Sequence, residues 1–439
     1  MQYVNCNITI AGHTIQYVED GLAGTRELEG TLGDNALRIL TVRRLSHWIN
    51  YAMTQEATQG PPLARELEDL KVLGLHLYHI LFATEKVRDR FQKTYREVKQ
   101  KCLTVPDLRL RLWLVFEPGT EHLAGLPWEF LFIAEEDNLD TGVFVAGERT
   151  ELLLTRKIKV PDFVQNLSPK ESDLRILLVT CQPEKIEREI LGQIDEREVE
   201  ELIKTIQGLG ATTRWVTVEH LRNPAYGDLK RRIDSDKPHI IHYVGHGKEG
   251  NIALSKHGSD PDYDIAAGGE QFRWVTSKQV KALFTDQKPR LVFLNACKGA
   301  ASESVESFKS TARDLVYAGI PGVVAMQYGI TNADAIIFAK RFYEEIGKGK
   351  EVDEAVKLGR KALGDLFPPW GHPRFATPVV YLQSSEAFVE PSETGGPAET
   401  AAAGRPAQSG TPATVALRGQ EPRAAERRAP EPEGASFTT

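Results

Sequence analysis

The 439-residue sequence predicts an α/β protein built on a mostly parallel sheet that is flanked by helices. From Leu174 onward, short apolar runs rich in β-branched residues alternate with segments of helical periodicity, which is typical of parallel strands joined by covering helices. Two of these runs end in a reactive side chain beside a glycine. In such sheets the functional side chains lie at the carboxyl ends of the strands. The pattern that predicts the fold therefore also predicts where the functional site lies.

Residues 1–165 are predicted to form a first α/β half. Alternation of apolar and polar residues predicts two strands at the start of the chain, joined at a Gly12-His13 turn, and apolar residues at helical spacing then predict helices. A period of two returns near residue 108, as expected of a strand with one buried face. The expected elements are strands over Cys6–Ile10, Thr14–Val18, Leu108–Phe116 and Leu152–Thr155, a helix over Ala36–Met53, and two helices within Leu63–Gln100.

Residues 170–384 are predicted to form the second half, after a proline-containing linker near 160–172. Residues 251–275 are expected to be an irregular insertion. The expected strands are Arg175–Cys181, Thr212–Val218, His239–Val244, Arg290–Asn295, Gly322–Met326 and Thr377–Leu382. The expected helices are Asp195–Gln207, Pro224–Ile233, Ser277–Phe284, Ser304–Tyr317, Asn332–Ile346 and Glu351–Ala362.

Residues 385–439 are dominated by Ala, Pro, Gly, Glu and Arg. Such a composition cannot bury enough apolar surface to offset the entropy lost on ordering, so this tail is predicted to be disordered.

The bulk composition narrows the class of function. A formal net charge of −7 argues against a protein that binds the nucleic-acid backbone directly. The four cysteines form no C-x-x-C pair, so neither a zinc site nor a disulfide framework is predicted, and no metal or other cofactor is expected. No apolar run approaches membrane-spanning length and the N-terminus has no signal-peptide pattern, so a cytoplasmic location with no membrane partner is predicted.

The two reactive strand ends carry an imidazole and a thiol. The run from Ile240 ends in Gly245-His246-Gly247, and the run from Leu291 ends in Asn295-Ala296-Cys297, 51 residues after the histidine. An unperturbed thiol is mostly protonated at neutral pH, so a nucleophilic cysteine needs a neighbouring base. If the two runs are parallel strands of one sheet, both groups emerge at one edge and can form a Cys–His dyad.

These residues resemble the CHAT family of caspase-like cysteine peptidases, relatives of caspases and separases. The caspase signature Gln-Ala-Cys-[Arg/Gln/Gly]-Gly lies about 50 residues after its histidine, and Asn-Ala-Cys-Lys-Gly departs from it at two of five places while keeping the spacing. The resemblance rests further on Leu126-Pro127-Trp128-Glu129 and on the block from Leu315 to Tyr328.

The resemblance implies His246 as base, Cys297 as nucleophile, and the Gly247 and Cys297 backbone N–H groups as oxyanion donors. It implies that residues 1–165 form a degenerate pseudo-caspase half and residues 170–384 the active half. The expected reaction is hydrolysis of peptide bonds in a protein partner through a thioester, in a bacterial signalling or defence pathway with a regulatory partner encoded nearby. Trp128, Glu129 and His242 are interpreted as structural.

Substrate preference is open at this point. The loops expected beside the site offer Glu184, Gln327 and Tyr328 as pocket residues, which favours a basic or uncharged residue before the cut, whereas Lys185 or Lys298 would favour an acidic one. Two other functions remain. One is a CHAT-fold interaction scaffold with an idle dyad, and the other is a hydrolase or transferase acting on a small acyl group.

Overall fold

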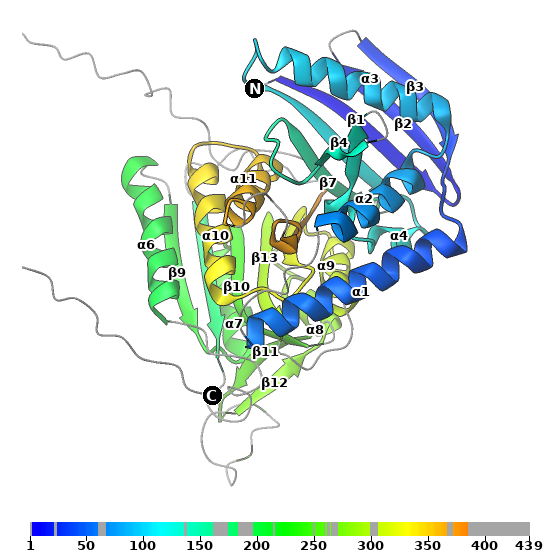
Figure 1. Cartoon of the computed structure of the whole chain (residues 1–439). Helices are drawn as coiled ribbons and strands as arrows, with labels where there is room; N and C mark the ends of the chain where they lie inside the picture. Colours follow the sequence, from blue (N-terminus) through cyan, green and yellow to red (C-terminus); the bar gives the residue numbers. More distant parts are fainter. Residues whose placement is uncertain are drawn as a thin grey trace, which may run out of the picture. The chain divides into compact units, whose positions relative to one another are not determined.

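The structure, a computed structural model, describes most of the chain up to Ser384. The described residues are 2–21, 24–59, 67–135, 138–160, 174–182, 196–213, 216–248, 251–258, 260, 264, 271–298, 306–366 and 372–384. They belong to one compact unit, Met1–Ser392, and the predicted disordered tail lies outside them. A 13-stranded sheet runs through this unit, with helices packed against its faces (Figure 1).

The first part of the sheet contains a parallel trio flanked by antiparallel strands. β4 pairs in parallel with β1 on one side and with β7 on the other, while β2 and β3 extend the sheet outward in antiparallel fashion. Alternate residues of β1 are buried, as the period of two predicts, whereas β4 is buried at every position except the half-buried Arg109 and Val115. The strands are β1 (Gln2–Ala11), β2 (Thr14–Gly21), β3 (Gly24–Thr31), β4 (Leu108–Phe116) and β7 (Leu152–Ile158).

The second part is a larger parallel block in the order β9, β8, β10, β13, β14. β15 joins the two parts, because it pairs antiparallel with β14 and in parallel with β7 through Tyr381 and Arg156. The hairpin β11–β12 pairs with the end of β10. The strands are β8 (Leu174–Cys181), β9 (Val216–Arg222), β10 (Ile240–Lys248), β11 (Asn251–Lys256), β12 (Gln271–Val275), β13 (Leu291–Lys298), β14 (Gly322–Met326) and β15 (Pro378–Leu382).

Helices divide into two layers that enclose two apolar cores. One core lies under α1 (Ala36–Gln59), α2 (Leu67–Leu81) and α3 (Glu85–Lys101) and continues under α7 (Tyr226–Asp236), α8 (Ser277–Leu283) and α9 (Glu306–Tyr317). The other lies under α6 (Glu196–Thr213), α10 (Asn332–Gly347) and α11 (Val352–Gly364), which stand on the opposite face in Figure 1. The second part of the sheet is therefore covered on both faces.

Several short elements lie in the segments that connect the longer strands and helices. They are α4 (Glu121–Ala124), the 3₁₀ helices η1 (Trp128–Phe130) and η3 (Pro373–Ala376), and a separate two-stranded sheet of β5 (Phe132–Glu135) and β6 (Asn138–Phe144).

The predicted α/β class, with a mostly parallel sheet flanked by helices, is confirmed. The predicted irregular insertion 251–275 is wrong in part, since it contains β11 and β12. The sequence analysis also missed β3, β5 and β6, and it began β9 too early because α6 continues to Thr213. The division into halves at residues 165 and 170 stays a prediction.

Within the described part of the chain, no helix is both long and apolar enough to cross a lipid bilayer. The same residues contain no cluster of three or more His, Cys, Asp and Glu side chains placed to hold a metal ion.

Candidate active site

β10 and β13 bring the two predicted reactive positions together. The strands pair in parallel from Ile240 and Leu291 onward, and this register makes His246 and Cys297 direct partners at the carboxyl ends. Partners on neighbouring strands have backbones about 4.8 Å apart. Of Cys297, only the backbone belongs to the described part of the structure. The backbone thus satisfies the spatial condition that the sequence analysis set for a dyad.

Burial controls the protonation of His246. Its side chain is 4% exposed, and loss of solvation lowers its pKa from the usual 6.5 to about 4. Among the residues that the structure describes, none hydrogen-bonds to its Nδ1 atom. The imidazole is therefore neutral at pH 7 and has an unused ring nitrogen, as a proton acceptor requires.

Tyr243 holds the end of β10 that carries this histidine. Its hydroxyl donates to the backbone oxygen of His246 at 3.2 Å and to that of Ala253 in β11 at 2.7 Å. The ring lies over Gly245, where a Cβ atom would stand 2.3 Å from the Tyr243 hydroxyl. Glycine is therefore required at 245 by close approach of this tyrosine, and the sequence analysis did not identify Tyr243 as part of the site.

Gly247 lies between two strands at the end of β10. It pairs in register with Lys298 of β13 on one side and with Ile252 of β11 on the other. Its predicted role as an oxyanion donor, shared with the Cys297 N–H, stays a prediction.

His242 is a structural residue, as the sequence analysis interpreted it. Its fully buried ring stacks against Phe293 with centroids 4.1 Å apart, and its Nδ1 atom shares a hydrogen bond with the Tyr343 hydroxyl at 3.2 Å. Burial lowers its pKa to about 3, so it stays neutral in the core.

The role of the three predicted pocket residues at the site stays a prediction. Glu184 lies outside the described residues. Gln327 is buried and donates from its Nε2 atom to Glu129 at 2.9 Å and to the Ala376 backbone oxygen at 2.5 Å. The Tyr328 hydroxyl, also buried, shares a hydrogen bond with Ser46 at 2.9 Å. These internal contacts favour a structural role for Gln327 and Tyr328.

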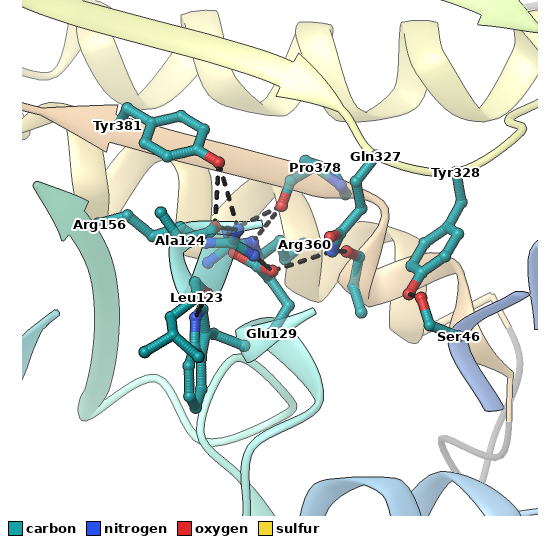
Figure 2. Close-up of polar contacts among 12 residues, drawn as sticks. Ser46, Leu123, Ala124, Glu129, Arg156, Gln327, Tyr328, Arg360, Pro378 and Tyr381 are labelled. Carbon is teal, nitrogen blue, oxygen red and sulfur yellow. Dashed lines mark hydrogen bonds and ion pairs between the residues drawn. The ribbon is translucent and has the colours of Figure 1, made fainter. Parts of the chain in front are cut away.

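The motif Leu126-Pro127-Trp128-Glu129 builds a buried polar junction (Figure 2). Trp128 donates from its indole nitrogen to the Leu123 backbone oxygen at 2.8 Å. The Glu129 carboxylate is fully buried and pairs with Arg156 of β7 and, at 3.2 Å, with Arg360 of α11. These contacts confirm the structural interpretation of the motif.

The junction has more positive than negative charge, and backbone oxygens compensate for the excess. Arg156 donates to the Ala124 oxygen at 2.7 Å, and Arg360 donates twice to the Pro378 oxygen, at 2.9 and 2.7 Å. Burial lowers the pKa of Arg360 to about 10, which leaves it charged at pH 7. Glu129 comes from η1, Arg156 from β7 in the first part of the sheet, and Arg360 from α11, which covers the second part, so the junction ties the two parts together.

The other cysteines behave as small buried or partly buried groups. Cys6 lies 3.3 Å from the Tyr17 hydroxyl, and burial raises its pKa to about 12. Cys181 is buried with its sulfur 3.8 Å from Ser255, and Cys102 donates to the Leu108 oxygen at 3.3 Å. Neither Cys6 nor Cys102 has the lowered thiol pKa that a reactive cysteine needs, since burial raises the pKa of both.

Comparison with known proteins identifies the family. A family model for the CHAT domain matches residues 73–365, which is more than half of the chain, and the chain belongs to this family. Membership supports a cysteine peptidase as the class of function, as the resemblance implied. No curated protein matches the chain.

Solved structures give more distant likenesses. The Saccharomyces cerevisiae separase–securin complex matches at 13% identity and a TM-score of 0.47, over 87% of this chain and 30% of that one. The Arg-specific cysteine proteinase gingipain R matches at 11% identity and a TM-score of 0.38, over 79% of this chain and 74% of that one. The chain thus spans less than a third of the separase chain.

Proposed function

We propose that the chain is a cysteine endopeptidase in which Cys297 is the nucleophile and His246 the base. The observation that carries this proposal is the register of β10 and β13, in which these two residues are direct partners at the carboxyl ends of neighbouring parallel strands. Register partners on neighbouring strands share a face of the sheet, which is the placement that a Cys–His dyad requires.

The chemistry follows from this pairing. The Cys297 sulfur attacks the carbonyl carbon of the scissile bond while His246 accepts the thiol proton, and His246 then gives this proton to the leaving amine as the C–N bond breaks. Water hydrolyses the resulting thioester and restores the thiol. The backbone N–H groups of Gly247 and Cys297 stabilise the oxyanion, and loss of one such donor costs about 3–4 kcal/mol.

The neutral state of His246 supports its role as base. Burial lowers its pKa to about 4, so the imidazole is unprotonated over the whole physiological range, which is the form that a base must have. The acidic limb of a rate profile is then expected near pH 4 instead of near pH 6.5.

The substrate and the setting complete the proposal. The substrate is a protein partner, and activity is controlled by a regulatory partner encoded nearby in a bacterial signalling or defence pathway, in the cytoplasm. The resemblance to the CHAT family implies this setting, and Glu184, Gln327 and Tyr328 stay the predicted residues for the preference before the cut.

Mapping of new protein N-termini tests the proposal. Cells that express the wild-type chain together with its neighbouring genes are compared with cells that express Cys297→Ala or His246→Ala. New N-termini are expected with the wild type and are expected to disappear in both variants, while Cys102→Ala, which removes a partly buried cysteine elsewhere, retains them. Identical N-termini in the wild type and Cys297→Ala would contradict the proposal.

An interaction scaffold is the second candidate, favoured by the burial of His246 to 4% exposure. A scaffold predicts that Cys297→Ala and wild type bind the same partner and produce no new N-termini. A transferase for a small acyl group predicts an acylated Cys297 without cleavage of protein.

A further inference from the structure

The first part of the sheet has one face that helices cover only in part. α11 lies over Arg111 of β4, which pairs with Asp353 at 2.6 Å. Beyond this covered region the same face is hollowed into a groove of about 540 Å³. Strands β1, β2, β4 and β7 contribute to it, and its lining comprises Asn7, Thr9, Gln16, Trp113, Val115, Glu117, Lys157, Lys159, Val160, Gln383 and Ser384.

The groove combines apolar surface with one lysine that has no partner among the described residues. Trp113, Val115 and Val160 supply the apolar part. Glu117 pairs with Lys159 at 2.7 Å, so these two charges compensate each other. Lys157 is half-buried and has no ion-pair or hydrogen-bond partner within the described part of the chain, which leaves one uncompensated positive charge in the groove.

The described chain ends in this groove. Gln383 is buried, with its backbone N–H donating to the Pro321 oxygen at 2.9 Å and its Nε2 atom to the Ile158 oxygen at 2.9 Å. These two bonds fix the point where the chain leaves β15, and Ser384 lines the groove directly after it. The last described residue of the chain therefore lies in the groove.

The sequence after Ser384 complements this surface. It continues Ser385-Glu386-Ala387-Phe388-Val389-Glu390, with an aromatic residue between two acids. No Lys or Arg occurs from Ser385 to Gly404, whereas Glu recurs at 386, 390, 393 and 399. An acidic, aromatic-centred segment thus begins beside an unpaired lysine and a tryptophan.

We propose that residues 385–390 dock into this groove, with Phe388 against Trp113 and Val115 and with Glu386 or Glu390 near Lys157. The length is sufficient. Six extended residues reach about 20 Å, and the span from β7 to β2 is three strand spacings, about 14 Å. This docking gives the uncovered face an intramolecular cover, and it holds whether or not the chain is a peptidase.

Photo-cross-linking in the full chain tests the docking. p-Benzoylphenylalanine replaces Phe388 in one variant and Phe437 in a matched control, because Phe437 is the other aromatic residue after Ser384. After irradiation, mass spectrometry of the band with monomer mobility is expected to find cross-links from position 388 to the peptides that contain Trp113 or Val160. Position 437 is expected to give none with these peptides.

Charge reversal then tests the role of Lys157. Lys157→Glu is expected to lower the cross-linked fraction from position 388 by about three- to fivefold, the effect of one exposed ion pair changed to a repulsion. Lys93→Glu, on the exposed side of α3, is expected to leave it unchanged. If Lys157→Glu fails to fold, Glu386→Lys combined with Glu390→Lys makes the same test without altering the sheet.

Three outcomes would overturn the inference. They are cross-links from position 388 that map elsewhere or to no peptide, cross-links found only in a dimer band, which would assign the groove to a second copy, and cross-linking that is indifferent to both charge reversals.

Discussion

The two parts of the sheet present neighbouring parallel strands in comparable places, yet their ends carry different groups. β4 and β7 pair in register up to Phe116 and Ile158, and the residues that follow, Glu117 and Lys159, form an ion pair. β10 and β13 pair in register up to their own ends, where His246 and Cys297 are partners. The carboxyl ends of two neighbouring parallel strands thus carry a half-exposed salt bridge in one part of the sheet and the candidate dyad in the other.

The covering of the strands differs in the same way. β4 alternates apolar residues with Arg109 and Arg111, which pair with carboxylates of α11, and further along the same face Val115 is only half-buried. β10 and β13 are apolar toward both faces, because helices lie on each side. The difference teaches that the doubly covered part desolvates the residues at its strand ends, which is what lowers the pKa of His246.

The largest expected effect is on the junction between the parts. Glu129→Ala leaves Arg156 and Arg360 buried without their carboxylate and is expected to lower the free energy of unfolding by about 3–5 kcal/mol in urea titrations. Glu117→Ala removes a similar pair that is half-exposed, and is expected to cost at most about 1 kcal/mol. Equal losses would mean that Glu129 does not join the two parts.

Acid sensitivity is expected to originate in the doubly covered part. His242 and His246 have pKa values of about 3 and 4, below the 6.5 of an unfolded chain, so below pH 6.5 the unfolded chain binds protons that the folded chain does not. The contribution of these neutral histidines to the free energy of unfolding is therefore fully present above pH 6.5. It falls as the pH decreases toward 4, by roughly 1.4 kcal/mol per pH unit for each histidine.

Urea titrations at pH 7, 6 and 5 measure this slope. His242→Phe keeps the packing against Phe293 but removes one titrating group, so its slope is expected to be less steep by about 1.4 kcal/mol per pH unit. Parallel slopes for the wild type and the variant would show that His242 does not stay neutral in the fold.

A smaller effect is expected at the end of β10, which carries His246. Tyr243→Phe removes the hydroxyl that bonds His246 and Ala253, and is expected to cost about 1–2 kcal/mol of stability and to lower kcat more than it changes KM. Tyr317→Phe removes a hydroxyl that bonds Glu121 instead, and is expected to leave kcat unchanged. Identical kinetics in the two variants would restrict Tyr243 to a structural role.

The smallest effect is expected on the uncovered face. Lys157→Ala is expected to change the free energy of unfolding by no more than about 0.5 kcal/mol, because no side chain of the described residues depends on it. Arg111→Ala on the same face is expected to cost about 3 kcal/mol or more, since it removes the cation that pairs with the buried Asp353 carboxylate. Similar costs for both variants would contradict the contrast between covered and uncovered regions.

Most of the fold could be predicted because the sequence contains strong local patterns. The alternation of β4 and the apolar runs of β10 and β13 indicate strands because burial on one or both faces dictates those patterns. β3 was missed because it is an edge strand with charged residues on both faces, and β11 because its pairing with the end of β10 leaves no periodic signal. The strand-end glycines identified His246 and Cys297, and the register then made them partners.

The surroundings of the site depended on contacts between distant segments. Nothing local in Gln327 or Tyr328 shows that Glu129 and Ser46 occupy their polar atoms, since these partners come from the first part of the chain. Tyr243 likewise acquires its role only when Gly245 lets its ring fold back to His246 and Ala253.

Thiol reactivity tests the central claim most directly. A low concentration of an iodoacetamide probe is added to the native protein at pH 7, and the labelled cysteine is identified by peptide mass spectrometry in the wild type and in His246→Ala. The account predicts rapid labelling of Cys297 alone in the wild type and a loss of that rate in the variant, with Cys6 and Cys181 protected by burial. Slow labelling of Cys297 at the same rate with and without the imidazole would contradict it.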